Sequence, residues 1–196
     1  MLLYDISRDV MTAKVYEGDP VPQYKYIKST DAGDEYNLSE FSMCSHNSTH
    51  IDAPYHFDPD GEKIGDMRLS TFYGKCTVVT IKGILTGEDM EKLLPYCKKR
   101  ILLHGEGEAY ISQSAAVVIA DSGVVLVGTD GMSLSTAFDE TRVHLEFARK
   151  GVAVLEGLDL TGIHDGEYTL CAFPLKISES EAAPCRAILM EQEKGF

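Results

Sequence analysis

Hydrophobic and polar residues are arranged differently in the two parts of the chain. Up to about residue 60 the sequence is rich in Tyr, Ser, Asp and Pro and has few long apolar runs, which predicts short strands and loops. Beyond that point, short apolar and often β-branched runs alternate with segments that have helical features. The strands predicted there are residues 76–84, 101–103, 124–127 and 152–155.

Two helices are predicted from residues that suit their first positions. Thr86 suits the N-cap of a helix running toward Cys97, which Pro95 should end early or kink. Ser112 suits the N-cap of a second helix that ends near Gly123. Strands therefore alternate with helices along this part of the chain.

A third and longer helix is predicted over residues 135–150, ending at Gly151. Its apolar positions, expected to pack inward, are Phe138, Val143, Phe147 and Ala148. Two further strands, within residues 168–177 and 185–190, would extend the sheet and could be antiparallel. The alternation predicts an α/β sandwich, and the length of 196 residues is accommodated by a single domain spanning residues 1–196.

Composition narrows the classes of partner. The chain carries 31 acidic and 18 basic residues, a formal net charge of -13. This charge favours solubility and argues against nucleic acid or an anionic membrane as partner. Because the first residues show no basic segment followed by an apolar one, and no apolar run is long enough to span a bilayer, we expect a cytoplasmic location.

The five cysteines are scattered, odd in number and without a C-x-x-C pair, which disfavours both a disulfide framework and a thiolate zinc site. We expect most of them to be small buried apolar residues. Cys44 precedes a group of histidines and could be a nucleophile, but no neighbouring feature singles it out. The five are Cys44, Cys76, Cys97, Cys171 and Cys185.

The segment at residues 45–57, SHNSTHIDAPYHF, concentrates residues with metal-binding side chains. It contains His46, His50, Asp52 and His56 within eleven positions, and histidine and carboxylate are usual ligands of zinc and manganese. The alternative is a loop of individually solvated histidines. Because Pro54 interrupts a regular helix and the histidine spacing does not suit a strand, we expect an irregular loop around a metal ion.

Two later residues are weaker candidates when taken alone. His144 lies on the third predicted helix, where a histidine is more often a surface or packing residue. Glu156 ends an apolar strand, and a buried carboxylate generally needs a cation or strong donors beside it. Asp130 and Ser133 could orient metal-bound histidines, and Arg186 could meet a substrate carboxylate or pair with Glu181 or Asp165.

The motif HNSTHIDAPYHF, followed by His144 and Glu156 in the spacing H-x11-E, resembles the cyclase-like metal-dependent hydrolases, a family that includes bacterial kynurenine formamidases and isatin hydrolases. The resemblance runs nearly end to end. Its supporting segments are DIS at 5–7, EGDP at 17–20, GTDGMS at 128–133, VLEGLDL at 154–160, FPLKI at 173–177 and APCRAIL at 183–189.

The resemblance implies a mixed-sheet α/β sandwich of the swivelling β/β/α type with two divalent metal ions per subunit, zinc first and manganese second. His46, His50 and Asp52 would hold one ion, and Asp52, His144 and Glu156 the other. Two such ions would bind a bridging water, lower its pKa and polarise an amide carbonyl. His56 would then be the acid/base residue, and Tyr16 would lie against the substrate ring.

The resemblance also implies hydrolysis of a small amide, with N-formylkynurenine as the first candidate. Alternatives are an isatin-like cyclic amide or lactone, or a non-catalytic binding module folded around metal. The family commonly forms homodimers or larger homo-oligomers in which the N-terminal segment reaches a neighbour, so Tyr16 could complete a partner's site. Two features depart from the family pattern: Ser48 replaces a glycine in the histidine motif, and the chain has no tryptophan.

Overall fold

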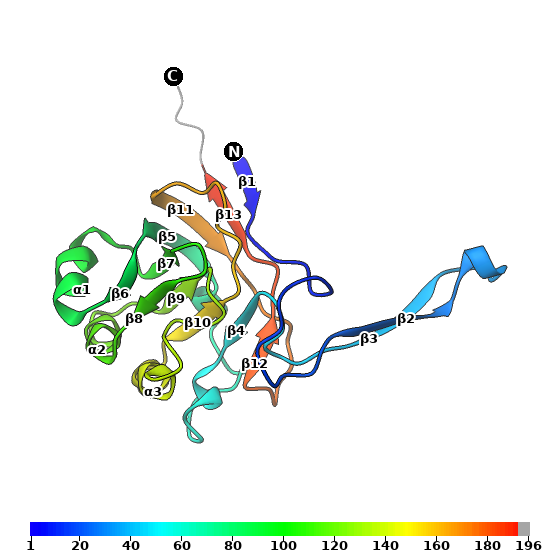
Figure 1. Ribbon diagram of the computed structural model, residues 1–196, viewed down its shortest axis with the longest axis horizontal. Helices are drawn as coiled ribbons and strands as arrows, with labels where there is room; N and C mark the ends of the chain where they lie inside the picture. Colours follow the sequence, from blue (N-terminus) through cyan, green and yellow to red (C-terminus); the bar gives the residue numbers. More distant parts are fainter. Residues whose placement is uncertain (192–196) are drawn as a thin grey trace.

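The computed structural model describes residues 1–191 and is built on one large mixed sheet (Figure 1). The sheet has nine strands, and at each edge of the sheet two neighbouring strands come from segments far apart in the sequence. Across the sheet the strands are β1 (Leu2–Asp5), β13 (Ile188–Glu191), β11 (Gly166–Cys171), β5 (Tyr73–Thr80), β7 (Arg100–His104), β9 (Leu126–Thr129), β10 (Ala153–Glu156), β4 (His50–Asp52) and β12 (Ala182–Pro184).

The centre of the sheet is parallel, from β5 through β7 and β9 to β10, and its flanks are antiparallel. Parallel neighbours need crossover connections, which here contain α1 (Gly87–Leu93), α2 (Gln113–Asp121) and α3 (Glu140–Lys150). These helices lie together on one face of the sheet (Figure 1). The mixed α/β fold expected from the sequence is confirmed.

Two apolar cores follow from the alternation of side chains along the strands. On β7, Ile101 and Leu103 face the helices, whereas Leu102 faces the opposite side. On β10, Val154 packs toward the helices and Leu155 toward the other core, where the chain after β10 and the antiparallel strands cover it. Burial on both faces explains why these strands read as continuous apolar runs.

The first two helices begin where the sequence predicts. Thr86 caps α1 through a reciprocal capping box with Asp89, and Pro95 lies in a 3-10 turn, Leu94–Tyr96, that follows the helix. Ser112 caps α2, and its hydroxyl accepts a hydrogen bond from the backbone of Ala115.

The third helix begins later than predicted: α3 starts at Glu140 and not at residue 135. The backbone before α3 forms hydrogen bonds to other elements. The Leu134 N–H donates to Glu156 Oε1 at 3.0 Å, and the Leu134 carbonyl accepts from the Ile111 N–H at 2.9 Å. The predicted inward packing of Phe138 is wrong, since its side chain is 83% exposed and lies beneath Arg142.

Two further expectations change in detail, and a third is confirmed. The predicted strand 76–84 divides into β5 and β6 (Gly83–Leu85), because Gly83 adopts a left-handed conformation; β6 pairs in parallel with β8 (Ala109–Ile111). The antiparallel arrangement of the C-terminal strands is confirmed. All five cysteines are free, but Cys76 alone is buried and the other four are half-buried, so the expectation that most of them are buried is wrong.

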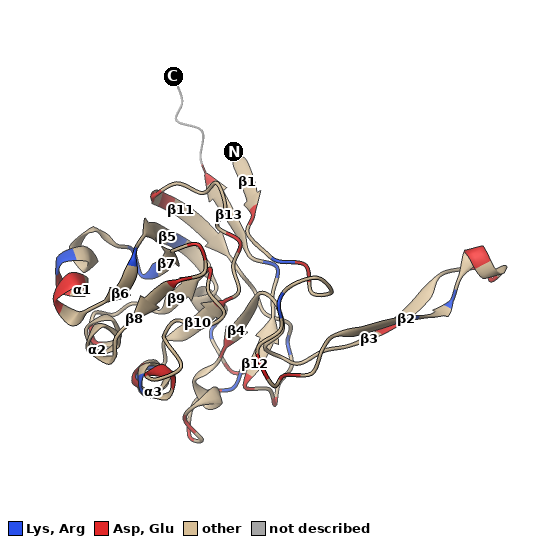
Figure 2. Cartoon of the chain, viewed as in Figure 1, with Lys and Arg blue, Asp and Glu red and all other residues tan. Residues whose placement is uncertain are grey.

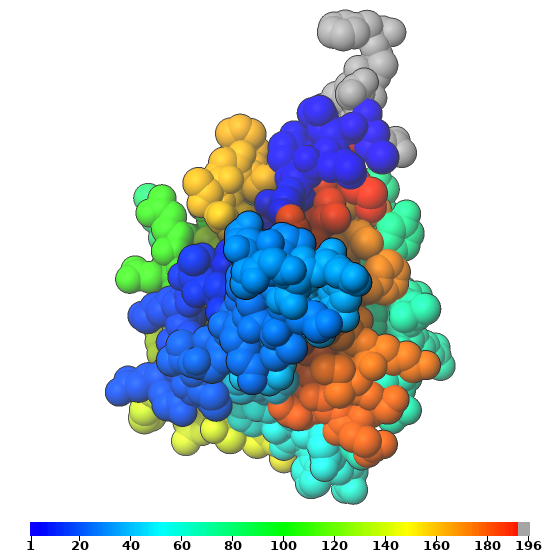
Figure 3. All heavy atoms as spheres, turned by 90° about the vertical axis from the view of Figure 1, so that its right-hand side faces the viewer, coloured from blue at the N-terminus to red at the C-terminus, as the bar shows by residue number. Residues whose placement is uncertain are grey.

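Strands β2 (Gln23–Lys28) and β3 (Leu38–Ser42) form a separate antiparallel hairpin that projects from the body (Figure 1). Its tip contains a 3-10 turn, Thr30–Ala32. Figure 3 looks at this arm end on, in front of the body. Nearly every side chain of the two strands is exposed. No helix in residues 1–191 is long and apolar enough to cross a membrane.

Gly157, which follows β10, fixes how closely this strand end approaches the loop before β4. Its φ is +68°, and a Cβ there would lie 2.3 Å from the carbonyl oxygen of Ser48. Its N–H donates a hydrogen bond to the Gly131 carbonyl at 2.9 Å, and its carbonyl accepts one from the Thr49 hydroxyl at 2.6 Å. Only glycine satisfies both the conformation and the close approach.

We predict that Gly157→Ala destabilises the fold by more than about 2 kcal/mol, because left-handed strain of about 1–2 kcal/mol adds to the clash with Ser48. Gly151→Ala is the matched control, since Gly151 has φ +69° but open space around a Cβ. Urea unfolding midpoints of the two variants test the difference. Equal losses would show that the close approach to Ser48 is not a constraint.

Candidate functional site

Strand β4 carries two polar side chains into the interior. It pairs antiparallel with β10 and β12, and the register sets His50 opposite Glu156. Because successive strand residues point to opposite faces, His50 and Asp52 share one face while Ile51 enters the apolar core. The expectation of an irregular loop is wrong for this strand; pairing with β10 overrides the local pattern, and Pro54 begins a 3-10 turn, Pro54–His56.

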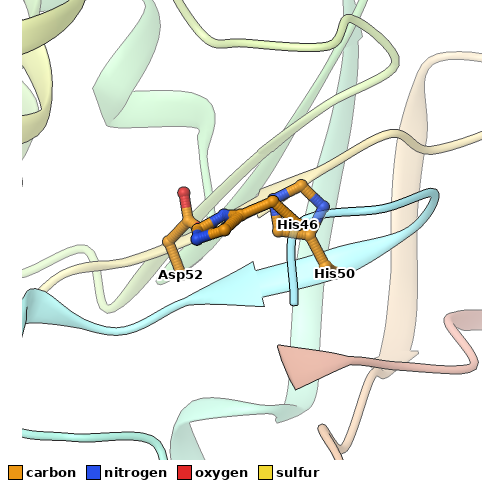
Figure 4. Close-up of side chains that lie close together, drawn as sticks. All are labelled: His46, His50 and Asp52. Carbon is orange, nitrogen blue, oxygen red and sulfur yellow. The ribbon is translucent and has the colours of Figure 1, made fainter. Parts of the chain in front are cut away.

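Residues of the histidine motif converge on Asp52 (Figure 4). The Nδ1 atom of His46 lies 2.9 Å from Asp52 Oδ1, and His50 Nε2 lies 3.2 Å from the same oxygen. Glu156, at the end of β10, lies 3.8 Å from His50 Nε2 through Oε2 and 3.2 Å from His144 Nε2 through Oε1.

These five side chains form two overlapping sets of donors. The first is His46, His50 and Asp52, and the second is Asp52, His144 and Glu156; within each set the donor atoms lie within 4.8 Å of one another. Asp52 belongs to both sets. All five are buried except His46, which is half-buried.

Backbone carbonyls fix which nitrogen of each buried histidine faces the cluster. His50 Nδ1 donates to Ser48 O at 3.0 Å, and His144 Nδ1 donates to Glu140 O at 2.8 Å. Each Nε2 is thereby left as the atom directed at the carboxylates. Asp130 and Ser133 were candidates for this orienting role, but Asp130 accepts hydrogen bonds from Gly105 N–H instead.

The cluster fits a cation. Within the described residues, the buried atoms His50 Nε2 and Asp52 Oδ1 have no hydrogen-bond partner. Buried polar atoms without partners cost free energy, and a metal ion between them removes that cost. A set of imidazole nitrogens and carboxylate oxygens suits zinc and manganese alike.

Electrostatics support the same interpretation. Burial alone would lower the pKa of His50, but the charge of Asp52 raises it to about 9. Burial likewise opposes the effect of Glu156 on His144, whose pKa also rises to about 9. The carboxylates therefore draw positive charge into the cluster, which a divalent cation would supply without protonating the histidines.

His56 has a different environment from the other histidines of the motif. It lies on the 3-10 turn after β4, is half-buried, and belongs to neither donor set. Its ring centroid is 4.2 Å from that of His46. Burial lowers its pKa below the usual value for histidine, which favours the neutral form that accepts a proton.

The cluster opens into a cavity of about 400 Å³ lined also by His56, Phe57 and Tyr16. Tyr16 lies at the cavity of its own chain, where its hydroxyl donates to Glu140 Oε2 at 3.0 Å. Phe57 stacks on His144 with ring centroids 4.7 Å apart. The N-terminal segment thus forms one wall of the cavity.

Sequence reasoning missed two contacts of the site and misplaced a third. Glu181 lies 3.3 Å from His46 Nε2 and accepts a hydrogen bond from Ser45 at 2.6 Å; no sequence pattern marked it. Phe57 lies inside the motif, and its position beside His56 was the available signal. Arg186 pairs with Asp5 at the surface and not with Glu181, Asp165 or the cavity.

Comparison with known proteins is consistent with this geometry. Residues 4–136 match the family model "Cyclase". A kynurenine formamidase of Delftia acidovorans is 33% identical over 95% of this chain and 96% of its own length. A solved structure titled as a potential metal-dependent hydrolase with cyclase activity shares 26% identity at TM-score 0.81, covering 98% of each chain.

Isatin hydrolase A from Labrenzia aggregata, solved with benzyl benzoate bound, superposes with TM-score 0.80 over 98% of this chain and 94% of its own. Its identity to the chain is 18%, so this likeness concerns the fold.

Proposed function

The chain belongs to the Cyclase family and is a metal-dependent hydrolase of amide bonds other than peptide bonds, and we propose that it cleaves a small aryl formamide, with N-formylkynurenine as the specific substrate. The observation that carries the proposal is the pair of donor sets sharing Asp52 at the end of an open cavity. The 33% identity to a kynurenine formamidase supports the choice of substrate.

We assign the metal ligands by donor set. His46, His50 and Asp52 hold one divalent ion, and Asp52, His144 and Glu156 hold a second. We propose zinc as the ion and keep manganese as the alternative, since the nitrogen and oxygen donors of this site suit both metals. A bound cation supplies Lewis acidity, lowering the pKa of a water toward neutrality and polarising the amide carbonyl.

His56 performs the proton transfers in this proposal. It accepts a proton from the water that attacks the formyl carbon and delivers that proton to the departing nitrogen as the C–N bond breaks. The products are formate and the free aryl amine. Its lowered pKa and its place outside both donor sets suit this role.

The cavity also separates the proposed activity from a purely structural metal site. A structural site closes its coordination with protein atoms, whereas here the donors border about 400 Å³ of accessible space. This volume is in the range of small-molecule sites, about 300–1,000 Å³. Tyr16 and Phe57 offer aromatic surface beside it. A cyclic amide such as isatin is the competing substrate, and parallel assays of both compounds decide between them.

We predict that His56→Ala retains the metal content of the wild type while its turnover of N-formylkynurenine falls by about 10²–10⁴-fold, the usual contribution of an acid/base residue. His164→Ala is the matched control, because the side chain of His164 is exposed and lies outside the cavity. Metal analysis and steady-state kinetics on the same samples give the result. Loss of metal together with activity would make His56 a ligand.

We further propose that the chain forms a homodimer through the β2–β3 arm. Tyr24, Tyr26 and Phe41 share one face of this hairpin, because Tyr24 lies opposite Phe41 in the register and Tyr26 is two residues further on. These three residues are 47%, 63% and 60% exposed. An isolated two-stranded hairpin is marginally stable in water, so a second copy covering this aromatic face would account for its persistence.

The wild type is expected to sediment as a dimer at micromolar concentration, and the double variant Tyr26→Ser/Phe41→Ser as a monomer. Tyr96→Ser is the control, since Tyr96 is 79% exposed on the body and lies outside the arm. A monomeric wild type, or a double variant that remains dimeric, would refute the arm as the interface.

A further inference from the structure

Two cations line the cavity without a carboxylate partner. Arg8 and Lys14 both border it, and neither forms an ion pair with any described acidic residue. The chain has 31 acidic and 18 basic residues, and both kinds are spread over the body and the arm in Figure 2. Several other basic side chains, such as that of Lys82, also form no ion pair within residues 1–191, so what sets Arg8 and Lys14 apart is their position beside the cavity and how Arg8 is held there.

Arg8 is held in place from both its backbone and its side chain. Its N–H donates to Thr49 Oγ1 at 2.9 Å, and its carbonyl accepts from the Ser48 hydroxyl at 2.8 Å. The guanidinium donates from Nε to Leu158 O and from Nη2 to Asp130 O, at 2.9 and 2.8 Å.

Both acceptors are neutral backbone carbonyls, so neither of them offsets the positive charge of the guanidinium. The Nη1 atom also makes no hydrogen bond to a described residue. A guanidinium fixed in this way is preorganised for an anionic oxygen.

Ser48 explains how this chain fixes Arg8. It adopts a left-handed conformation, φ +63°, that L residues rarely occupy, and it stands where the family pattern has glycine. The hydroxyl that glycine lacks makes the bond to the Arg8 carbonyl. The serine therefore adds an anchor for the N-terminal segment at the cost of backbone strain.

The cavity opening also carries unpaired negative charge. Asp19 and Glu106 line it, and neither forms an ion pair or a side-chain hydrogen bond within the described chain. Glu140 lines it too, but its carboxylate accepts the hydroxyl of Tyr16. A purely anionic ligand would be repelled by these carboxylates, whereas a headgroup with both charges matches the full set.

We propose that Arg8 and Lys14 bind the carboxylate of a zwitterionic amino-acid headgroup on the substrate, remote from the scissile amide, with its ammonium group facing Asp19 and Glu106. This inference rests on the proposed amide hydrolysis and adds the residues that determine specificity. It distinguishes amides that carry an amino-acid group from neutral aryl formamides and from isatin, which lack one.

The test compares two aryl formamides. One is N-formylkynurenine, and the other is 2-formamidoacetophenone, which keeps the aryl ketone and formamide but lacks the headgroup. For Lys14→Gln we expect KM for N-formylkynurenine to rise about tenfold with kcat nearly unchanged, because a charged contact made equally in ground and transition states is lost. KM for the truncated substrate should not change. Arg8→Gln should show the larger effect.

Lys82→Gln is the matched control, because Lys82 is an exposed lysine that forms no ion pair with the described part of the chain and does not line the cavity. The inference is overturned if Lys14→Gln affects both substrates by the same factor, or affects neither. Calorimetric binding of kynurenine, the deformylated product, provides a readout independent of turnover. About tenfold weaker binding to Lys14→Gln supports the headgroup contact, and unchanged binding refutes it, even if the wild type hydrolyses neither formamide.

Discussion

The antiparallel pairing of β4 with β10 is the constraint on which the site depends. Its register sets His50 opposite Glu156, and the strand period then directs Asp52 to the same face. Two carboxylates and the histidines beside them therefore meet at the inner end of the cavity, where most of them are buried. Within residues 1–191, the arrangement leaves His50 Nε2 and Asp52 Oδ1 without hydrogen bonds, and the charge of Asp52 raises the pKa of His50 to about 9 against the effect of burial. A divalent cation resolves both effects at once.

The surrounding chain stabilises this arrangement with contacts from distant segments. Gly157 permits the close approach of the strand end to Ser48. The Thr49 hydroxyl donates a hydrogen bond to the carbonyl of Gly157 and accepts one from the N–H of Arg8. The end of β10, the loop before β4 and the N-terminal segment are thereby joined at one point. The same contacts that position the donors also build the cavity wall, so site geometry and substrate access depend on one small network.

The sequence predicted the parts of the site that are close together or carry a specific motif. The density of His46, His50 and Asp52 pointed to a metal, and the family resemblance added His144 and Glu156. The local pattern could not show that residues 50–52 form a strand, because that outcome depends on pairing with β10. It also missed Glu181, whose approach to His46 is set by the placement of β12.

Helix positions were predictable to different degrees for physical reasons. Caps are local, so Thr86 and Ser112 marked two helix starts correctly. The start of α3 was not local, since Leu134 is held by Glu156 and Ile111 from other elements. No sequence pattern marked Arg8 and Lys14 either, and their proposed role in substrate binding follows from their place beside the cavity.

The central claim is that the donor sets sharing Asp52 hold the metal ions that enable amide hydrolysis. The most direct measurement is metal content per chain of protein purified without chelator, for the wild type and Asp52→Asn, beside formamide hydrolysis by the same samples. The account predicts about two divalent ions per chain in the wild type, with metal and activity lost together in the variant. A wild type that is metal-free and cannot be reconstituted, or a variant that keeps both metal and activity, would contradict it.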